Sequence, residues 1–281
     1  MKKLLLPMTL AAACSKQDSV STFGQSNVSV IQPDHIIIVF LENRGFNQII
    51  NNSNAAYINS LKDNGYLFKN FHGIAHPSYP NYIAFFSGST QGITSDACLE
   101  VKYKAQNLYS KLKAVGKTCA WYSEDLPAQG STICKASNYA EKHNASTIFK
   151  NVPVSANKMF SQLPADYTQL ENLVLITPNL INDMHSGTVQ QGDVWIQTKL
   201  GALADWCKNN NSIFIITFDE DNHTPENRIP VILYGEHVVT GSDSINYDHY
   251  NMTRTICSLF GANQGWTDSL KNRKAIKGFL K

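Results

Sequence analysis

The chain has 281 residues, enough for one large α/β domain or two small ones. Its 24 Lys and Arg residues nearly balance its 22 Asp and Glu residues, which gives a net charge of +2. Because it contains no basic stripe and no run of like charge, the sequence argues against a nucleic-acid partner. A hydrophobic share of 43% is enough for a sizeable core. No linker or repeat follows residue 33, so we predict one domain over residues 34–281.

The N-terminal residues are typical of an export signal. Lys2 and Lys3 precede a short apolar run that ends in small residues directly before Cys14. We predict a signal peptide over 1–13 and a polar, flexible tether over 14–33, and we expect a periplasmic, membrane-anchored or secreted protein. Small residues before Cys14 look like a bacterial lipobox, which favours a lipid anchor on Cys14. Cleavage of a plain signal peptide nearby is the alternative.

Five cysteines remain after Cys14, and export would expose them to an oxidising compartment. One or two disulfides are therefore expected, and Cys98, Cys119 and Cys134 are the best candidates because they lie close together in the sequence. An odd count leaves at least one free thiol, and the pairing stays open. The sequence has no C-x-x-C, which argues against a thiolate zinc site.

Continuous apolar runs predict strands buried in a parallel sheet. The predicted strands cover residues 35–41, 66–71, 118–122, 173–177, 212–218 and 229–234. Helical patterns alternate with them over residues 55–64, 81–86, 108–115, 193–209 and 248–260. The segment 135–162 follows neither pattern and is interpreted as an insertion. The alternation predicts an α/β fold with a doubly wound sheet.

Polar side chains follow several of the predicted strands. Glu42 and Asn43 follow the first strand, and Asn179, Asp183 and His185 follow the strand that ends at Thr177. Open α/β sheets bind ligands at this edge. A solvated loop after the first strand, and a surface histidine at position 185, are the alternatives.

Three consecutive acids, Asp219, Glu220 and Asp221, follow the strand over 212–218. Acids gathered at the end of a buried strand repel one another and are costly without a cation. The set of oxygen donors fits a hard divalent cation, and the sequence leaves Ca, Mg, Mn and Zn open.

Ser78 lies two residues before Pro80, at the start of the predicted buried helix. Proline is tolerated in a first helical turn, so the Ser78 hydroxyl is expected at a helix N-terminus, where an anion is favoured. A serine that only caps the helix is the alternative. Oxygen donors, a hydroxyl and histidines together suit metal-assisted displacement at phosphorus.

Five motifs occur in a fixed order and resemble the phosphoesterase family of bacterial phospholipases C and acid phosphatases, within the alkaline phosphatase superfamily. They are Glu42-Asn43-Arg44-Gly45-Phe46, His76-Pro77-Ser78-Tyr79-Pro80-Asn81-Tyr82, Thr177-Pro178-Asn179 with Asp183-Met184-His185, Thr217-Phe218-Asp219-Glu220-Asp221-Asn222, and Tyr247-Asp248-His249-Tyr250. The resemblance implies a three-layer α/β/α fold with a mostly parallel, doubly wound sheet.

The resemblance also implies roles for individual residues. Ser78 would carry a phosphoseryl intermediate, and the metal would be held by Glu42, Asn43, Asp219, Glu220 and Ser78 itself. Asn81 would fix the nucleophile turn or a phosphate oxygen, and His185 would bind the phosphoryl group or protonate the leaving oxygen. His76 and His249 would belong to the same pocket. Distant two-zinc relatives carry Asp-His where this chain has Asp219-Glu220, which favours one hard cation.

The expected activity is hydrolysis of a phosphate ester, of the acid phosphatase type. A phospholipase C or another phosphodiesterase could use the same groups, and its substrate would be a phospholipid. A lipoprotein that binds a metal or ligand without catalysis is a third interpretation. A metal-dependent rate with any phosphate ester would exclude this last interpretation.

Overall fold

The computed structural model describes residues 31–99, 102–266 and 270–281. The predicted signal peptide and Cys14 lie outside these residues, as does the predicted tether apart from residues 31–33. From residue 31 onward the chain forms one compact unit.

A mostly parallel sheet lies at the centre of this unit, in the order β10-β2-β9-β8-β1-β7-β3-β6, with β11 paired to β2. Its strands are β1 (His35–Leu41), β2 (Tyr66–His72), β3 (Cys119–Ser123), β6 (Asn157–Met159), β7 (Leu173–Thr177), β8 (Ser212–Phe218), β9 (Arg228–Gly235), β10 (Gly241–Asp243) and β11 (Tyr247–Asp248). Strand β9 runs antiparallel to both of its neighbours, β2 and β8. The α/β fold predicted from the sequence is confirmed.

The central strands β1 and β8 are buried along their lengths because both faces of the sheet are covered. They pair in parallel from His35 with Ser212 to Leu41 with Phe218. The residues that follow these two strands therefore emerge side by side at the carboxyl edge of the sheet.

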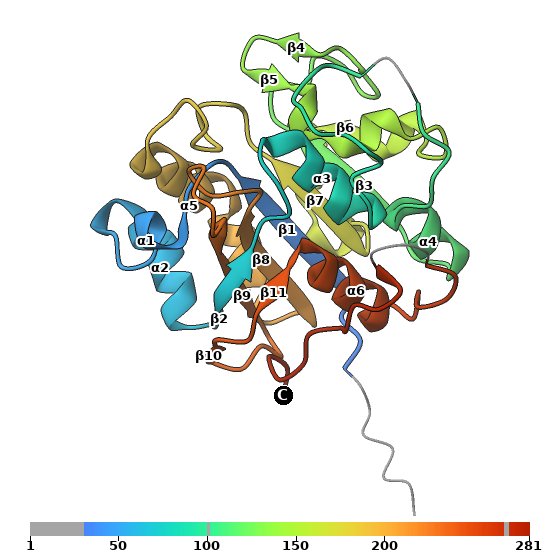
Figure 1. Cartoon of the computed structure of the whole chain (residues 1–281). Helices are drawn as coiled ribbons and strands as arrows, with labels where there is room; N and C mark the ends of the chain where they lie inside the picture. Colours follow the sequence, from blue (N-terminus) through green and yellow to red (C-terminus); the bar gives the residue numbers. More distant parts are fainter. Residues whose placement is uncertain (1–30, 100–101, 267–269) are drawn as a thin grey trace, which may run out of the picture. The chain divides into compact units, whose positions relative to one another are not determined.

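Helices cover the two faces of the sheet in separate groups. The helices are α1 (Phe46–Ile49), α2 (Ala56–Asp63), α3 (Ser78–Ser87), α4 (Leu108–Ala114), α5 (Val189–Cys207) and α6 (His249–Leu259). Figure 1 shows α3, α4 and α6 on one side of the sheet and α1, α2 and α5 on the other. Helix α3 packs on α6, and α2 packs on α5, which completes the three layers.

Helix α5 differs from the sequence prediction at its start, because it begins at Val189 rather than at residue 193. Thr188 and Gln191 form a capping box at this end. Asp193 therefore lies inside the helix, and its carboxylate accepts hydrogen bonds from the backbone N–H groups of Tyr57 and Ile58 at 3.0 and 2.8 Å. It caps α2 rather than its own helix.

The segment that the sequence left without a pattern contributes β6 to the sheet and otherwise forms short elements. They are the hairpin of β4 (Lys135–Ala136) and β5 (Tyr139–Ala140) and the 3-10 helices η2 (Glu141–His143), η3 (Ala145–Ile148), η4 (Val154–Ala156) and η5 (Phe160–Gln162). A disulfide joins Cys98 to Cys134 at the start of this segment, whereas Cys119 is buried with a free thiol. Two of the three candidate cysteines thus form the bridge.

Among the described helices, none combines the length and the apolar character that crossing a bilayer requires.

Candidate active site

Two adjacent strand ends and one helix N-terminus meet at the carboxyl edge of the sheet. Glu42 and Asn43 follow β1, Asp219 and Glu220 follow β8, and Ser78 is the first residue of α3. The Asn43 backbone N–H donates to Asp219 Oδ1 at 3.2 Å, which ties the two strand ends together. The structure therefore brings together all five residues that the resemblance assigned to the metal.

Ser78 Oγ lies in the middle of this group, and the residue is only 1% exposed. The distances from Ser78 Oγ are 3.0 Å to Glu42 Oε2, 3.1 Å to Glu220 Oε1 and 3.5 Å to Asn43 Oδ1. A hydroxyl can donate only one hydrogen bond, so it cannot satisfy three acceptors. We define Glu42, Asn43, Ser78, Asp219 and Glu220 as the oxygen cluster.

The carboxylates of the oxygen cluster are poorly stabilised as anions by the protein itself. Burial raises the pKa of Glu42 well above its ordinary value, and the charges of Asp219 and Asp183 raise it further. Burial and the charge of Glu220 likewise raise the pKa of Asp219, and burial raises the pKa of Glu220. Among the described residues, no hydrogen-bond partner reaches the buried Asp219 Oδ2. Converging oxygens and an unpaired carboxylate oxygen fit a hard cation.

The turn before α3 is fixed by Asn81. Its Oδ1 accepts hydrogen bonds from the backbone N–H groups of Ile74 and Ala75, at 2.7 and 3.0 Å, and its Nδ2 donates to the Ala75 carbonyl at 2.8 Å. The peptide bond between His76 and Pro77 in this turn is cis. Of the two roles that the resemblance allowed Asn81, these contacts match the fixing of the nucleophile turn.

His76 contacts the oxygen cluster from outside. Its Nδ1 hydrogen-bonds Glu220 Oε2, and its Nε2 donates to the Thr224 carbonyl at 3.0 Å. Although burial lowers the pKa of His76, these hydrogen bonds and the charges of Glu220 and Asp221 raise it overall. His76 therefore orients Glu220 and does not contact the Ser78 hydroxyl.

His249 is buried below the cluster, at 1% exposure, and its Nε2–H donates to the Asp219 carbonyl at 2.7 Å. Burial lowers the pKa of His249, which favours the neutral ring. Its side chain stands among the rings of Phe40, Phe71 and Phe85. This position supports the backbone at Asp219.

His185 lies on the opposite rim, after β7, and is partly exposed. Its Nε2 is 3.4 Å from Lys142 Nζ, and its Nδ1 is 3.2 Å from Ser186 Oγ. Burial, together with the charges of His143 and Lys142, lowers the pKa of His185. Asn179, which follows the same strand, turns away and donates to Asp125 Oδ2 at 3.0 Å.

Sequence reasoning missed His143, which is buried in η2 at 3% exposure. Its Nδ1 donates to Asp183 Oδ2 at 3.0 Å, and its Nε2 lies 3.2 Å from Glu42 Oε2. Burial lowers the pKa of His143 and raises the pKa of Asp183 to about 8. Nitrogens of His143 and His185 and an oxygen of Glu42 lie within 4.8 Å of one another. No sequence pattern in the insertion indicated this histidine.

Tyr82 was also missed, although a signal for it existed. It lies four residues after Ser78 on α3, so both side chains share one face of the helix. The Tyr82 hydroxyl donates to Glu42 Oε1. Tyr82 therefore holds one oxygen of the Glu42 carboxylate, while Ser78 lies against the other.

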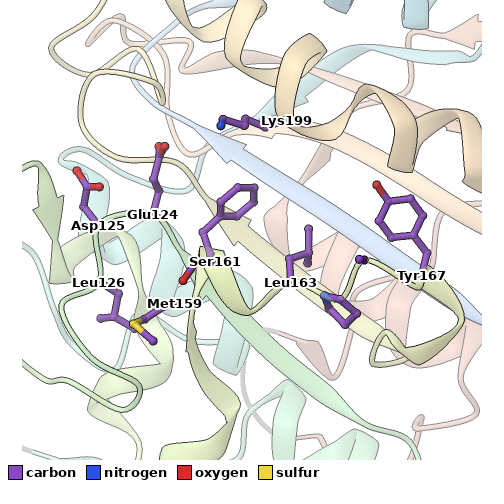
Figure 2. A pocket seen from close by; sticks show the side chains of 11 residues that line it. Glu124, Asp125, Leu126, Met159, Ser161, Leu163, Tyr167 and Lys199 are labelled. Atoms are coloured by element: carbon purple, nitrogen blue, oxygen red, sulfur yellow. The ribbon is translucent and has the colours of Figure 1, made fainter.

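A separate cavity of about 560 Å³ lies beyond the end of β3. Figure 2 shows the side chains that line it. Leu126, Met159 and Leu163 line it, with the acids Glu124 and Asp125 on one side. None of the oxygen-cluster residues lines this cavity.

The sequence of this chain matches a known protein family. The model of the phosphoesterase family matches residues 50–263. The chain is 41% identical over 229 residues to the phosphatidylinositol-3-phosphatase of Mycobacterium tuberculosis, which covers 81% of this chain and 77% of that protein. It is 28% identical to the phosphate-repressible acid phosphatase of Penicillium chrysogenum over 84% of this chain, and it spans 61% of the fungal protein.

Solved structures show the same fold at low sequence identity. A protein in the alkaline phosphatase superfamily from Vibrio parahaemolyticus superposes with a TM-score of 0.59 and 14% identity, over 82% of this chain and 67% of that one. The lipoteichoic acid synthase LtaP from Listeria monocytogenes gives a TM-score of 0.62 and 11% identity, over 85% and 76%. The chain therefore belongs to the phosphoesterase family, and it is a phosphoric ester hydrolase.

Proposed function

We propose that this protein is a phosphatase that depends on a divalent cation and hydrolyses phosphate monoesters through a phosphoseryl intermediate on Ser78. The observation that carries the proposal is the position of Ser78 Oγ. It lies at the N-terminus of a buried helix, within 3.5 Å of side-chain oxygens from Glu42, Asn43 and Glu220.

The residues of the oxygen cluster would hold the cation, because they offer oxygen donors and one of them, Asp219 Oδ2, has no hydrogen-bond partner among the described residues. When bound, a divalent cation would lower the pKa of the seryl hydroxyl and offset the charge of the phosphoryl oxygens. The oxygen-only donor set favours Ca, Mg or Mn over Zn.

The chemistry at Ser78 requires two displacements. Ser78 Oγ forms a bond to phosphorus while the bond to the leaving oxygen breaks. The hydroxyl proton moves to a neighbouring carboxylate such as Glu42 Oε2, from which Ser78 later regains it, and the leaving oxygen takes a proton from solvent. A water molecule then forms a bond to phosphorus as the bond to Ser78 Oγ breaks and the hydroxyl regains a proton. The first turn of α3 stabilises negative charge on the phosphoryl oxygens throughout.

The substrate class proposed is a monoester, because the relatives named above are phosphatases. The name of the Mycobacterium tuberculosis relative makes an inositol lipid with a 3-phosphate the first lipid substrate to test. Release of the headgroup from phosphatidylcholine, without release of inorganic phosphate, would instead indicate a phospholipase C.

The direct test is the rate with p-nitrophenyl phosphate of the wild type and Ser78→Ala, after removal of metal and addition of Ca, Mg, Mn or Zn. Loss of a nucleophile is expected to lower kcat by about 10⁴-fold or more. Ser87→Ala is the matched control, because Ser87 is a buried serine at the other end of α3 that bonds the Ile83 carbonyl. Wild-type turnover by Ser78→Ala would refute the nucleophile assignment.

We also propose that the chain is exported and that Cys14 carries the lipid anchor. The disulfide between Cys98 and Cys134 supports export, because disulfides persist in oxidising compartments. Cys14→Ser is expected to abolish incorporation of a labelled fatty acid in cells and to release the enzyme from membranes. Equal labelling of the variant would contradict the anchor.

A further inference from the structure

Two segments outside the oxygen cluster meet at its rim. Asp96 lies between α3 and α4, and Lys142 lies in η2, next to His143. The disulfide between Cys98 and Cys134 links the segment of Asp96 to the segment that leads into η2. Both side chains are partly buried, with 20% exposure for Lys142 and 30% for Asp96.

Lys142 and Asp96 connect the nucleophile helix to His185. Lys142 Nζ donates to Asp96 Oδ2 at 2.6 Å and to His185 Nε2 at 3.4 Å. The other oxygen of this carboxylate, Asp96 Oδ1, accepts the backbone N–H of Tyr79 at 3.0 Å. Tyr79 directly follows the nucleophile in the first turn of α3.

The Asp96 carboxylate thus binds the kinds of donor that a phosphate group binds. A helix N-terminal N–H and an ammonium group both favour an oxyanion, and the N–H belongs to the residue next to Ser78. A cavity of about 280 Å³ adjoins these groups, and Asp96, Lys142 and His185 all line it. No oxygen-cluster residue lines this cavity, and the link from Lys142 to the nucleophile turn runs through the Asp96 carboxylate and the Tyr79 N–H.

The negative charge of the oxygen cluster favours a further positive charge in addition to a divalent metal ion. Its three carboxylates, from Glu42, Asp219 and Glu220, carry more negative charge when ionised than one divalent cation offsets. Lys142 adds one positive charge near them. Although burial lowers the pKa of Lys142, the hydrogen bond to Asp96 and the charges of Glu42, Asp96 and Asp219 raise it overall. An ammonium ion at this rim would reduce the repulsion that a phosphate dianion meets.

We propose that Lys142 binds a phosphoryl oxygen of the substrate, and that Asp96 is an internal counter-ion that the substrate phosphate displaces from Lys142. This inference rests on the proposed function, because it places the phosphate beside Ser78. Lys142 therefore contributes to the affinity for phosphate, and the Asp96 carboxylate competes with phosphate for the Lys142 ammonium group.

The test uses inorganic phosphate as the probe and calorimetric binding to the full chain in a Ser78→Ala background, with the activating cation present. Lys142→Ala is expected to weaken phosphate binding by about tenfold or more, because a hydrogen bond to a charged group is lost, and Lys142→Arg by less. Asp96→Asn is expected to tighten binding by about threefold to tenfold, because the asparagine oxygen still accepts the Tyr79 N–H while the competing charge is gone.

The matched control is Lys158→Ala. Lys158 forms an ion pair with Glu171 at 2.6 Å and has 25% exposure, but it lies on β6, in a pair that includes no oxygen-cluster residue. Phosphate binding to this control should match that of the parent protein. Unchanged binding by Lys142→Ala would overturn the proposal. Weaker binding by Asp96→Asn would also overturn it, since Asp96 would then only position Lys142.

Steady-state kinetics in the Ser78-containing enzyme supply a second measurement. Lys142→Ala should raise both KM for p-nitrophenyl phosphate and the inhibition constant for phosphate, whereas Asp96→Asn should lower the inhibition constant. Because calorimetry requires no turnover, failure of the phosphoseryl mechanism would leave the binding result intact. Melting temperatures of the variants close to the wild-type value show that the fold is retained.

Discussion

Two groups of carboxylates in this protein, one at structural positions and one at the candidate site, differ in how their oxygens are satisfied. Asp193 is 5% exposed, and each of its oxygens accepts a backbone N–H from the start of α2. Glu124 accepts hydrogen bonds from the Asn179 N–H, from Asn182 Nδ2 and from Trp195 Nε1, at 2.8 to 2.9 Å. These acids hold parts of the fold together, and the protein supplies their hydrogen-bond donors.

Glu42 and Asp219 are fully buried, yet they face other acids as well as donors. Glu42 lies next to Ser78 and Tyr82, and Asp219 Oδ1 accepts the Asn43 N–H, while Asp219 Oδ2 lacks a partner among the described residues. Buried polar groups without partners cost free energy. The difference indicates that the first group serves the fold, and it supports the proposal that the second group binds a cation.

The comparison predicts the largest effect for Asp219→Asn. This substitution keeps the shape of the side chain but removes a charge from the oxygen cluster. We expect kcat/KM with p-nitrophenyl phosphate to fall by about 10²- to 10³-fold, as for loss of one electrostatic contact in an active site. Titration of the activating cation should show weaker binding. Activity within twofold of the wild type would place Asp219 in the group that serves the fold.

The same variant should be more stable than the wild type without cations. Because the pKa of Asp219 is raised in the folded state, its contribution to stability is fully present below its unfolded pKa of about 3.9. That contribution is lost as the pH rises through the folded-state pKa. In a chelating buffer, the free energy of unfolding should therefore fall with rising pH, and less steeply for Asp219→Asn. Denaturant unfolding at a series of pH values measures both slopes.

The sequence predicts the buried strands and the residues at their ends better than it predicts the insertion. Strands β1, β7 and β8 have the predicted bounds, because continuous apolar runs fix buried parallel strands. Glu42 and Glu220 were identifiable because they come after such strands, and Ser78 because it begins a buried helix. His143 and Lys142 were not, since η2 has no periodic pattern and their contacts with Glu42 and Asp96 form only in the folded chain. The start of α5 was missed although Thr188 and Gln191 mark it.

Asp193→Ala should affect stability and leave the chemistry intact. It removes both acceptors for the N–H groups of Tyr57 and Ile58, so we expect a loss of about 1–2 kcal/mol in the free energy of unfolding. Asp193→Asn is the matched control, because its remaining oxygen can still accept one of these bonds. The kcat of the folded Asp193→Ala variant should equal that of the wild type. A lower kcat would contradict the claim that Asp193 serves only the fold.

The smallest effect is expected for Trp195→Phe. The indole Nε1–H is one of three side-chain or backbone donors to the Glu124 carboxylate. Phenylalanine removes this donor but keeps an aromatic ring at position 195 of α5. Since Glu124 retains its other donors, the free energy of unfolding should fall by about 1 kcal/mol. A loss of several kcal/mol would mean that Glu124 depends on each donor, as an unsatisfied active-site acid would.

The central claim is that the buried acids of the oxygen cluster bind a divalent cation beside Ser78. Its most direct measurement is the change in the free energy of unfolding when Ca, Mg, Mn or Zn is added to protein that has been stripped of metal. For the wild type, a cation at 100 times its Kd should add about 2.7 kcal/mol. The gain should disappear in Asp219→Asn and persist in Asp193→Asn. An equal gain in both variants, or no gain in the wild type with any of the four cations, would contradict the account.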